Sequence, residues 1–346
     1  MSVSSVQSGV NKRGRIRVAV DAMGGDYAPE AIVGGALQAA RELPVEIILV
    51  GVKERIAPLV EKERGLDNVS IHHASEVVAM GAHPVEAIRR QRDSSIVVAT
   101  RLVKEGVADA VVSAGSTGAA MASSLLEWGR IKGIERPAIS TILPTLEGAC
   151  IMLDVGAQVD CRPSHLAQFA LMGSLYAERV LGIERPKVGL LNNGEEEGKG
   201  CELVRDAYPL IENLPGVNFI GNVEGRDILV GKADVIVCDG FVGNVVLKFA
   251  EGMGAVIFDL LREAILRNLR SQLGGLLLKP ALKELWRKMD YTEYGGAPLL
   301  GIQGVCIISH GSSNEKAVKN AVRVAWESVS GEIVAAITER ISKNGR

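Results

Sequence analysis

One local pattern recurs along this chain and constrains its fold more than any other feature: an apolar, strand-like run followed at once by a turn rich in glycine and polar residues. The first example is Ile16–Val20, which leads into Asp21–Asp26 (DAMGGD) and then into a helix-like segment opened by Pro29. Glycine lets the backbone approach a ligand closely, and a helix N-terminus offers unpaired N–H groups to an anion. Six such turns predict one sheet edge crowded with polar loops. The other five are Ser113–Gly118, Asp154–Gln158, Asn192–Gly194, Asp239–Asn244 and Ser309–Asn314.

Strands and helices are expected to alternate from Ile16 onward. The helical patterns include Ser94–Glu105, Thr117–Arg130 and Ser164–Leu181. This alternation with short linkers predicts an α/β fold with a mostly parallel, Rossmann-like sheet and helices on both faces. Ligands of such sheets bind outside the carboxyl ends of the strands. The candidate strands are Ile16–Asp21, Val45–Gly51, Val69–His73, Ala108–Ser113, Ile139–Leu143, Cys150–Asp154, Lys187–Leu191, Val217–Gly221, Ala233–Asp239 and Val305–Ser309.

Length and composition agree with this architecture. The chain has 346 residues, of which 47% are hydrophobic and only 4% aromatic, so we expect a core of Val, Ile, Leu and Ala. Length alone suggests roughly two domains, but no obvious linker divides the chain. We therefore expect a disordered tail over residues 1–14 and one domain over residues 15–346. No apolar run approaches the ~20 residues that span a bilayer.

Charge and cysteine usage exclude some classes of function. The formal net charge of −2 argues against a nucleic-acid binder. The five cysteines form no C-x-x-C pair, and three of them lie in apolar runs, which favours reduced core residues in the cytosol. His72 and His73 are adjacent on a strand and point to opposite faces, so they cannot share a metal ion. We expect no metal and no cofactor.

Several polar residues are candidates for binding a small anion. The turn at Gly24-Gly25 is neither a dinucleotide fingerprint nor a nucleoside triphosphate loop, and it suits free phosphate instead. Ser116 and Thr117 start a helix, either as phosphate donors or simply as N-caps. Lys199 lies between two glycines after an acidic run, in a loop that is either only solvated or places a point charge on phosphate.

Other residues suggest catalysis or protein docking. His310 follows a buried strand, where a lone histidine is either a structural hydrogen-bonding group or a catalyst. The basic residues Arg89, Arg90 and Arg92 form either a solvated helix face or a docking surface for an acidic protein. Arg130 and Lys132 form a second basic group with the same two interpretations.

The segment 241–292 carries two long helical patterns. The first, Phe241–Arg270, is expected to be broken or loosened at Gly252 and Gly254, and the second covers Leu276–Met289. The second pattern is amphipathic and basic, which is compatible with a membrane surface or an acidic partner. Packing on the core or on a second subunit is the alternative. The residues proposed for membrane contact are Leu276, Leu277, Lys279 and Lys283.

Taken together, the motifs closely resemble the phosphate acyltransferase family, in which acyl-acyl carrier protein and phosphate are the substrates. The resemblance runs from Ile16 to about Lys343, and this chain departs from the family pattern at Ser116, Gln158 and Cys201, where the family usually has Asn. The matching motifs are VAVDAMGGD (18–26), DSSIVVATRLVKEGVADAVVSAGSTGA (93–119), RPAIST (136–141), LDVGAQVD (153–160), GLLNNGEEEGKG (189–200), FIGNVEGRD (219–227), VCDGFVGNVVLK (237–248), YGGAPLLGI (294–302) and ISHGSS (308–313).

The resemblance implies transfer of a long acyl chain from acyl carrier protein to inorganic phosphate. The acyl phosphate would then serve a glycerol-3-phosphate acyltransferase in bacterial phospholipid synthesis. It also implies a three-layer α/β/α homodimer similar to isopropylmalate dehydrogenases and phosphotransacetylases, cytoplasmic and loosely attached to the membrane. Two alternatives stay open: a phosphate acetyl- or butyryltransferase-like enzyme on the same fold, and a non-catalytic scaffold that binds acyl carrier protein at the membrane.

The candidate residues fit this chemistry. Phosphate is already an anionic nucleophile, so it needs capture more than deprotonation, and direct attack needs no cysteine acyl-enzyme. We expect Gly24, Gly25, Ser116 and Thr117 to bind phosphate, and Asp21 and Asp26 to brace the first loop. We expect Lys199 to meet the developing charge, where one such donor can contribute ~3 kcal/mol. Asp239, Asn244 and His310 are expected to position groups or to handle protons.

Overall fold

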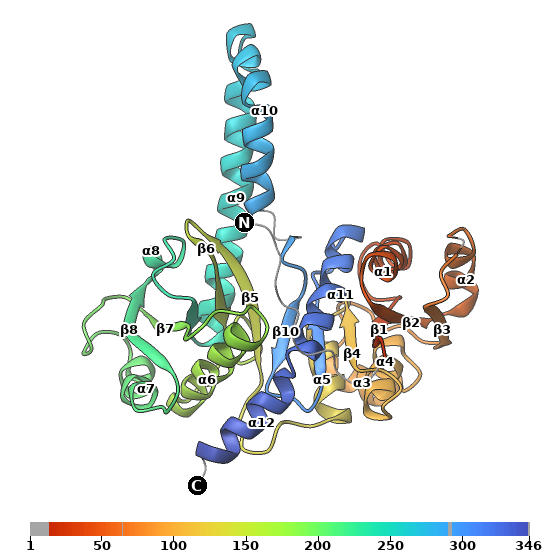
Figure 1. The fold of residues 1–346 in the computed structure, drawn as a ribbon, viewed down its shortest axis with the longest axis horizontal. Helices are drawn as coiled ribbons and strands as arrows, with labels where there is room; N and C mark the ends of the chain where they lie inside the picture. Colours follow the sequence, from red (N-terminus) through yellow and green to blue (C-terminus); the bar gives the residue numbers. More distant parts are fainter. Residues whose placement is uncertain (1–13, 64, 290–292, 345–346) are drawn as a thin grey trace.

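The computed structural model describes residues 14–63, 65–289 and 293–344. Within these residues a single eleven-stranded sheet is covered by helices on both sides (Figure 1). The strand order is β3-β2-β1-β4-β11-β10-β5-β6-β9-β7-β8. The strands are β1 (Ile16–Asp21), β2 (Val45–Gly51), β3 (Val69–His73), β4 (Ala110–Ser113), β5 (Ala138–Thr145), β6 (Gly148–Leu153), β7 (Lys187–Asn192), β8 (Asn218–Glu224), β9 (Val235–Val237), β10 (Ala297–Leu300) and β11 (Val305–Ile308).

Two hydrophobic cores form the interior, one on each face of the sheet, so the three-layer α/β/α expectation is confirmed. One core packs the sheet against α1, α6, α7, α11 and α12. The other packs it against α3, α4, α5, α8 and the start of α9. The helices are α1 (Glu30–Glu42), α2 (Lys53–Glu61), α3 (Pro84–Arg90), α4 (Ser95–Lys104), α5 (Thr117–Glu127), α6 (Pro163–Arg179), α7 (Glu202–Glu212), α8 (Gly225–Ile228), α9 (Gly240–Leu266), α10 (Leu269–Met289), α11 (Glu315–Ser330) and α12 (Ile333–Asn344).

The sheet is mostly parallel, as predicted, but its two halves run in opposite directions. The pairs β11–β10, β10–β5 and β5–β6 are antiparallel, and the other pairs are parallel. Three reversals leave β6, β9, β7 and β8 antiparallel to β1, β4 and β11. The expectation that all six polar turns share one sheet edge is therefore wrong, because the chain reverses through the β5–β6 hairpin and the short β10.

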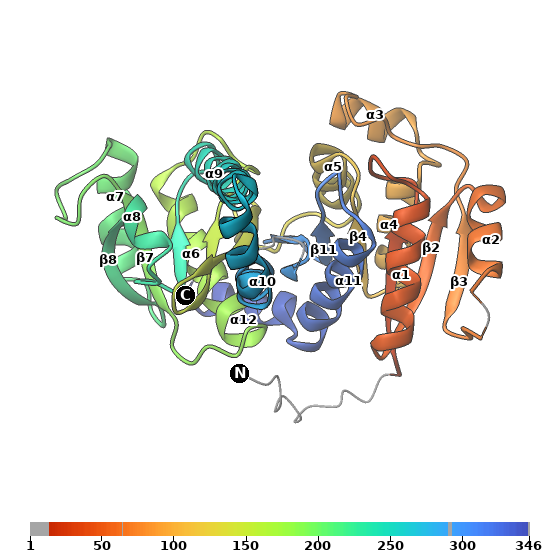
Figure 2. The same ribbon diagram turned by 90° about the horizontal axis from the view of Figure 1, so that it is seen from above.

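Two of the helices that begin at these turns, α5 and α9, contribute to the same hydrophobic core. In Figure 2, α5 and α9, each of which begins at one of these turns, lie on the same side of the sheet.

Helices α9 and α10 form a hairpin that projects from the body of the protein (Figure 1). The predicted break at Gly252 and Gly254 does not occur, since α9 continues without interruption from Gly240 to Leu266. Helix α10 begins at Leu269, earlier than the predicted Leu276. Helix α9 is also long and apolar enough to cross a membrane by length and composition, and only 6% of its apolar window is buried. The search for uninterrupted apolar runs did not predict such a helix, because two charged residues, Lys248 and Glu251, interrupt the apolar stretch of α9.

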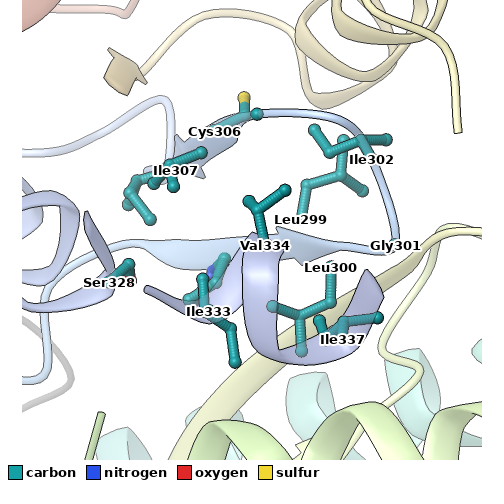
Figure 3. Close-up of a pocket in the computed structure, with 13 residues that line it drawn as sticks. Leu299, Leu300, Gly301, Ile302, Cys306, Ile307, Ser328, Ile333, Val334 and Ile337 are labelled. Carbon is teal, nitrogen blue, oxygen red and sulfur yellow. The ribbon is translucent and has the colours of Figure 1, made fainter. Parts of the chain in front are cut away.

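Strand β10 was missed by the sequence analysis, which left residues 294–302 unassigned. It has only four residues and contains a proline, and it pairs antiparallel with both neighbours. Between β10, β11 and α12 lies a cavity of about 10 Å³ whose lining is almost entirely aliphatic (Figure 3). A space of this size is at most that of one water molecule, and its apolar lining makes it a small packing gap of the core.

Candidate active site

The polar turns form two groups in the structure. The first-half loops are residues 21–26, 113–118 and 309–314, which follow the parallel strands β1, β4 and β11. The second-half loops are residues 154–158, 192–200 and 238–244, which follow β6, β7 and β9. Hydrogen bonds within each group determine which backbone donors remain available to a ligand.

Asp21 is the buried anchor of the first-half loops. Its side chain is 2% exposed, and Oδ2 accepts a hydrogen bond from Ser113 Oγ at 2.7 Å. Oδ1 accepts from the Met23 amide at 3.3 Å. Burial raises the pKa of this carboxyl group, and the bonds from Ser95, Ser113 and the loop amides oppose that rise. The geometry agrees with the predicted bracing role.

Gly24 and Gly25 lie where the first loop meets the turns after β4 and β11. A Cβ on Gly24 would come within 2.5 Å of Asp21 Oδ2 and 2.8 Å of the Gly115 amide nitrogen. Gly25 has φ +117°, a conformation that L side chains rarely adopt, and it lies against Ala114 and Gly311. The two glycines therefore allow three loops to pack backbone against backbone.

The start of α5 supplies backbone donors to the same place. Ser116 is the N-cap, and its Oγ accepts a hydrogen bond from the Ala119 amide at 3.4 Å, so the N-cap interpretation holds for this residue. Within the described chain, the amides of Gly25, Thr117 and Gly118 donate to no protein acceptor. Free amides at a helix N-terminus bind anions well. Thr117 adds a hydroxyl group at the first helical position.

Asp26 and His310 lie at the rim of the first-half loops. The Asp26 amide donates to the Gly311 carbonyl at 2.8 Å, so the bracing expected of Asp26 comes through its backbone. The exposed His310 ring lies within hydrogen-bonding distance of Ser312, with Nδ1 2.7 Å from Oγ. These contacts hold His310 in the loop that packs against Gly25 through Gly311.

The second-half loops have a different anchor, Asp154, which is fully buried at the end of β6. Oδ1 accepts hydrogen bonds from the amides of Ile139, Gly156 and Ala157 at 3.0 to 3.1 Å. Oδ2 accepts from the Gln158 amide at 2.6 Å. Burial raises the pKa of the Asp154 carboxyl group, and these four backbone bonds oppose the rise. The amides of this turn are already used by the carboxylate and are not available to phosphate.

Asp239 and Asn244 secure the start of α9. Asp239 is its N-cap, and Oδ1 accepts from the amides of Phe241 and Val242 at 3.0 and 2.9 Å. Asn244 Nδ2 donates to the Val155 carbonyl at 3.0 Å and so ties α9 to the Asp154 turn. In this structure both residues have a positioning geometry, and neither is brought to the first-half loops by these bonds.

Lys199 is exposed on the loop between β7 and α7. Its amide donates to the Glu196 carbonyl at 3.1 Å, and its own carbonyl accepts from Asn192 Nδ2 at 3.0 Å. Among the described residues Lys199 forms no ion pair, although Glu195, Glu196 and Glu197 precede it. The ammonium group is thus free to meet an anionic substrate.

The cysteines are all free, and three of them are buried. Burial raises the pKa of the Cys150 thiol to about 12 and that of Cys306 to about 11. The pKa of Cys161 is likewise raised to about 12, chiefly by burial. Such thiols are protonated at neutral pH and are poor nucleophiles, so these three cysteines are poor candidates for an acyl-enzyme.

One cluster that the sequence analysis missed joins Glu195, Glu224 and Asp227, whose carboxylate oxygens lie within 4.8 Å of one another. Lys232 contacts two of these three carboxylates, with Nζ 2.6 Å from Glu195 Oε1 and 3.5 Å from Asp227 Oδ2. Glu195 is distant from the other residues in sequence, and it meets them because β8 pairs with β7.

The predicted docking arginines lie on and after α3. Arg90 pairs with Glu86 at 2.7 Å, and Arg92 approaches Glu127 at 3.6 Å. Both side chains remain more than half exposed, at 76% and 58%. The predicted membrane residues lie on α10, where Leu276 and Leu277 are 65% and 83% exposed. These two leucines therefore do not pack on the core of this chain.

Comparison with known proteins defines the class of the molecule. The model of a family described as "fatty acid synthesis protein" matches residues 16–335. A phosphate acyltransferase of Desulfitobacterium hafniense (strain Y51) is 58% identical over 329 residues, which cover 95% of this chain and 98% of the relative. A phosphate acyltransferase of Heliobacterium modesticaldum is 57% identical over 328 residues, covering 94% and 98%. This chain belongs to the phosphate acyltransferase family and is an enzyme.

Solved structures with a similar fold agree with this architecture. A phosphotransacetylase from Streptococcus pyogenes has a TM-score of 0.64 at 18% identity, covering 93% of this chain and 94% of that one. A branched-chain phosphotransacylase from Enterococcus faecalis V583 has a TM-score of 0.58 at 16% identity, covering 91% and 99%. At these identities the likeness concerns the fold alone.

Proposed function

We propose that this protein transfers a long-chain fatty acyl group from acyl carrier protein to inorganic phosphate, giving acyl phosphate for phospholipid synthesis. The coarser activity, acyl transfer to phosphate, follows from family membership. The 58% identity to a phosphate acyltransferase over 95% of the chain is the observation that carries the proposal. The acyl carrier protein donor and the long chain are supported by the family's description as fatty acid synthesis proteins.

Phosphate is proposed to bind at the first-half loops. Free amides of Gly25, Thr117 and Gly118 surround the start of α5, and the Ser116 and Thr117 hydroxyl groups lie beside them. Helix N-termini carry partial positive charge, which favours a doubly charged anion. The second-half turn at Asp154 offers no such donors, because its amides already bind the buried carboxylate.

The reaction is proposed to be a direct displacement. A phosphate oxygen attacks the thioester carbonyl carbon, a C–O bond forms and the C–S bond breaks, and the electron pair leaves with the carrier's sulfur. A thiolate leaves readily because thiols have pKa values near 8.5. Lys199 is proposed to offset the negative charge that develops as phosphate approaches the carbonyl oxygen. Asn244 and Asp239 hold the α9 turn, and His310 is proposed to exchange a proton with phosphate.

The protruding hairpin is proposed to serve assembly and membrane contact. Along the stem of α9 an exposed apolar stripe recurs every four residues, which suits the matching face of a second copy. Its first members, Phe241, Val245 and Phe249, are 61%, 53% and 68% exposed. The exposed Leu276 and Leu277 of α10, with Lys279 and Lys283 beside them, suit an anionic lipid surface. The protein is then a cytoplasmic homodimer, loosely attached to the membrane, which delivers acyl phosphate to a glycerol-3-phosphate acyltransferase.

Lys199→Ala tests this assignment most simply. We expect kcat for phosphate-dependent release of the carrier thiol to fall by ~100-fold or more, because a donor to transition-state charge is lost. Lys187→Ala, an exposed lysine at the other end of β7, is the matched control and should retain full turnover. Normal turnover of Lys199→Ala would remove this residue from the site, and trapping of a labelled acyl group on a cysteine would contradict direct displacement.

A further inference from the structure

The loop that carries Lys199 is held by two side chains to which no role has been assigned. We propose that Asn192 and Lys232 are positioning residues that fix the backbone and the electrostatic surroundings of Lys199. The inference rests on the proposed function, in which Lys199 meets the charge of the reacting phosphate. Neither residue needs to touch substrate.

Asn192 closes the loop onto the end of β7. Its Nδ2 donates to the Lys199 carbonyl at 3.0 Å, and its Oδ1 accepts from the Asn193 amide at 2.8 Å. Gly200 follows with φ +94°, and a Cβ there would come within 2.4 Å of Asn192 Oδ1. The chain therefore turns directly over the Asn192 side chain, which sets the direction in which Lys199 leaves the backbone.

Lys232 pairs with one of the acidic residues that precede Lys199. Its ammonium lies 2.6 Å from Glu195 Oε1, and the hydrogen bond to this carboxylate raises the pKa of Lys232. Asp227 forms the second contact at 3.5 Å, and its own carboxylate is fixed by the Glu224 amide at 2.9 Å. Glu195 is thus paired with a fixed cation outside the loop and is not available to Lys199.

The two contacts act on different properties of the same residue. Asn192 holds the main chain of Lys199, whereas Lys232 removes a competing partner from its ammonium group. Glu195 is one of three glutamates that precede Lys199, and a carboxylate that paired with the Lys199 ammonium would reduce its attraction for phosphate. A small displacement of a charged group also lowers catalysis strongly, since misplacement by ~1 Å can cost ~100-fold in rate.

A double-mutant cycle between Asn192 and Lys199 separates positioning from folding. Asn192→Ala should lower kcat by roughly 10-fold with little change in KM for the acyl carrier substrate, and it should cost almost nothing in the Lys199→Ala background. Asn218→Ala is the matched control, because Asn218 Nδ2 also donates to a loop carbonyl, that of Arg185 at 3.1 Å, but on the outer strand β8. The control should leave kcat unchanged in both backgrounds.

Lys232 gives a second, independent variant at the surface. Lys232→Met should lower kcat by roughly 5-fold to 10-fold, again only when Lys199 is present, and Lys232→Arg should restore turnover because the ion pair with Glu195 is retained. Unfolding midpoints of all variants are measured alongside, so that loss of folded protein is subtracted.

The outcomes distinguish the two proposals. An equal loss from Asn192→Ala in both backgrounds, or full activity of Asn192→Ala and Lys232→Met, would overturn the positioning role and leave the proposed function intact. Full turnover of Lys199→Ala would overturn the role of Lys199 and the positioning inference together. Loss that disappears with Lys199, and is rescued by Lys232→Arg, supports the inference.

Discussion

Each group of loops contains a buried aspartate at the end of a strand, but the carboxylate oxygens of the two aspartates have different hydrogen-bond partners. The partners of Asp21 in the first-half loops include hydroxyl groups, of which Ser113 is one, as well as the Met23 amide. Asp154 in the second-half loops is surrounded by four backbone amides. A carboxylate that binds a hydroxyl group leaves neighbouring amides free for a substrate anion. A carboxylate saturated by amides makes its turn structural.

The largest effect is expected from adding a side chain where the first-half loops pack against one another. Gly24→Ala should raise KM for phosphate by ~100-fold, because the new Cβ would meet Asp21 Oδ2 and the Gly115 amide and push the loop off the start of α5. Gly252→Ala on α9 has open space around its Cβ and is the matched control. Initial rates against phosphate concentration give the answer. An unchanged phosphate KM in Gly24→Ala would move the phosphate site out of these loops.

The next largest effect is expected from substitutions in the projecting hairpin of α9 and α10, which belongs to the second half of the sheet. Leu276→Glu combined with Leu277→Glu should abolish sedimentation with anionic vesicles and spare turnover of soluble substrate. The reason is that two exposed leucines would otherwise enter the interface beside Lys279 and Lys283. Wild-type binding should also be released by high salt. Vesicle binding that survives the double substitution would assign the leucines to the dimer surface.

A smaller effect is expected from the arginines of the first half. Replacing Arg89, Arg90 and Arg92 by Glu should raise KM for acyl carrier protein by about tenfold and leave KM for phosphate unchanged, because acyl carrier proteins are acidic and charge complementarity speeds encounter. The effect should shrink as salt rises, since exposed charges are screened within ~8 Å at physiological ionic strength. If the carrier KM stays at the wild-type value, docking lies elsewhere, with Arg130 and Lys132 as the next candidates.

The smallest effect sharpens the contrast between the two aspartates themselves. Burial raises the pKa of both carboxyl groups, so each contributes stability that is full below pH ~4 and is lost as pH rises through the folded-state pKa. Asp21→Asn should therefore gain stability relative to wild type between pH 4 and 7, because Ser113 can reverse its hydroxyl group to accept from the new amide.

Asp154→Asn has no hydroxyl partner that could reverse its hydrogen bond. Every partner of Asp154 is a backbone amide, which can only donate, so the new NH₂ group would face a donor. We expect a loss of about 1–3 kcal/mol in the free energy of unfolding, largest at low pH. Urea unfolding at several pH values measures both variants. Equal changes in the free energy of unfolding for the two variants at each pH would contradict the distinction between hydroxyl and amide partners.

Much of the fold follows from the local pattern in the sequence. Apolar runs ending in polar turns located ten of the strands closely, and three-layer packing followed from their alternation with helices. Strand direction did not follow, because the reversal depends on the β5–β6 hairpin and on β10, whose Pro298 and four-residue length weaken any strand signal. The pairing of strands joins residues that are distant in sequence, so a local sequence pattern does not predict it.

The candidate site was predictable to a similar degree. Asp21, Gly24 and Ser116 come together because their strands are parallel neighbours, which the sheet-edge argument anticipates. The binding of the turn amides by Asp154 was not predicted, because it depends on the directions of the amides within the turn. The contact between Lys232 and Glu195 was not predicted either, because these residues are 37 positions apart in sequence.

The central claim is that phosphate binds at the first-half loops and is aimed from there at the acyl thioester. A crystal structure of the protein with inorganic phosphate tests it directly. The account predicts tetrahedral density within hydrogen-bonding distance of the Thr117 and Gly118 amides, in contact with the Gly24-Gly25 turn. Density at the Asp154 turn or along the Asn192–Gly200 loop alone, with the start of α5 empty at saturating phosphate, would contradict it.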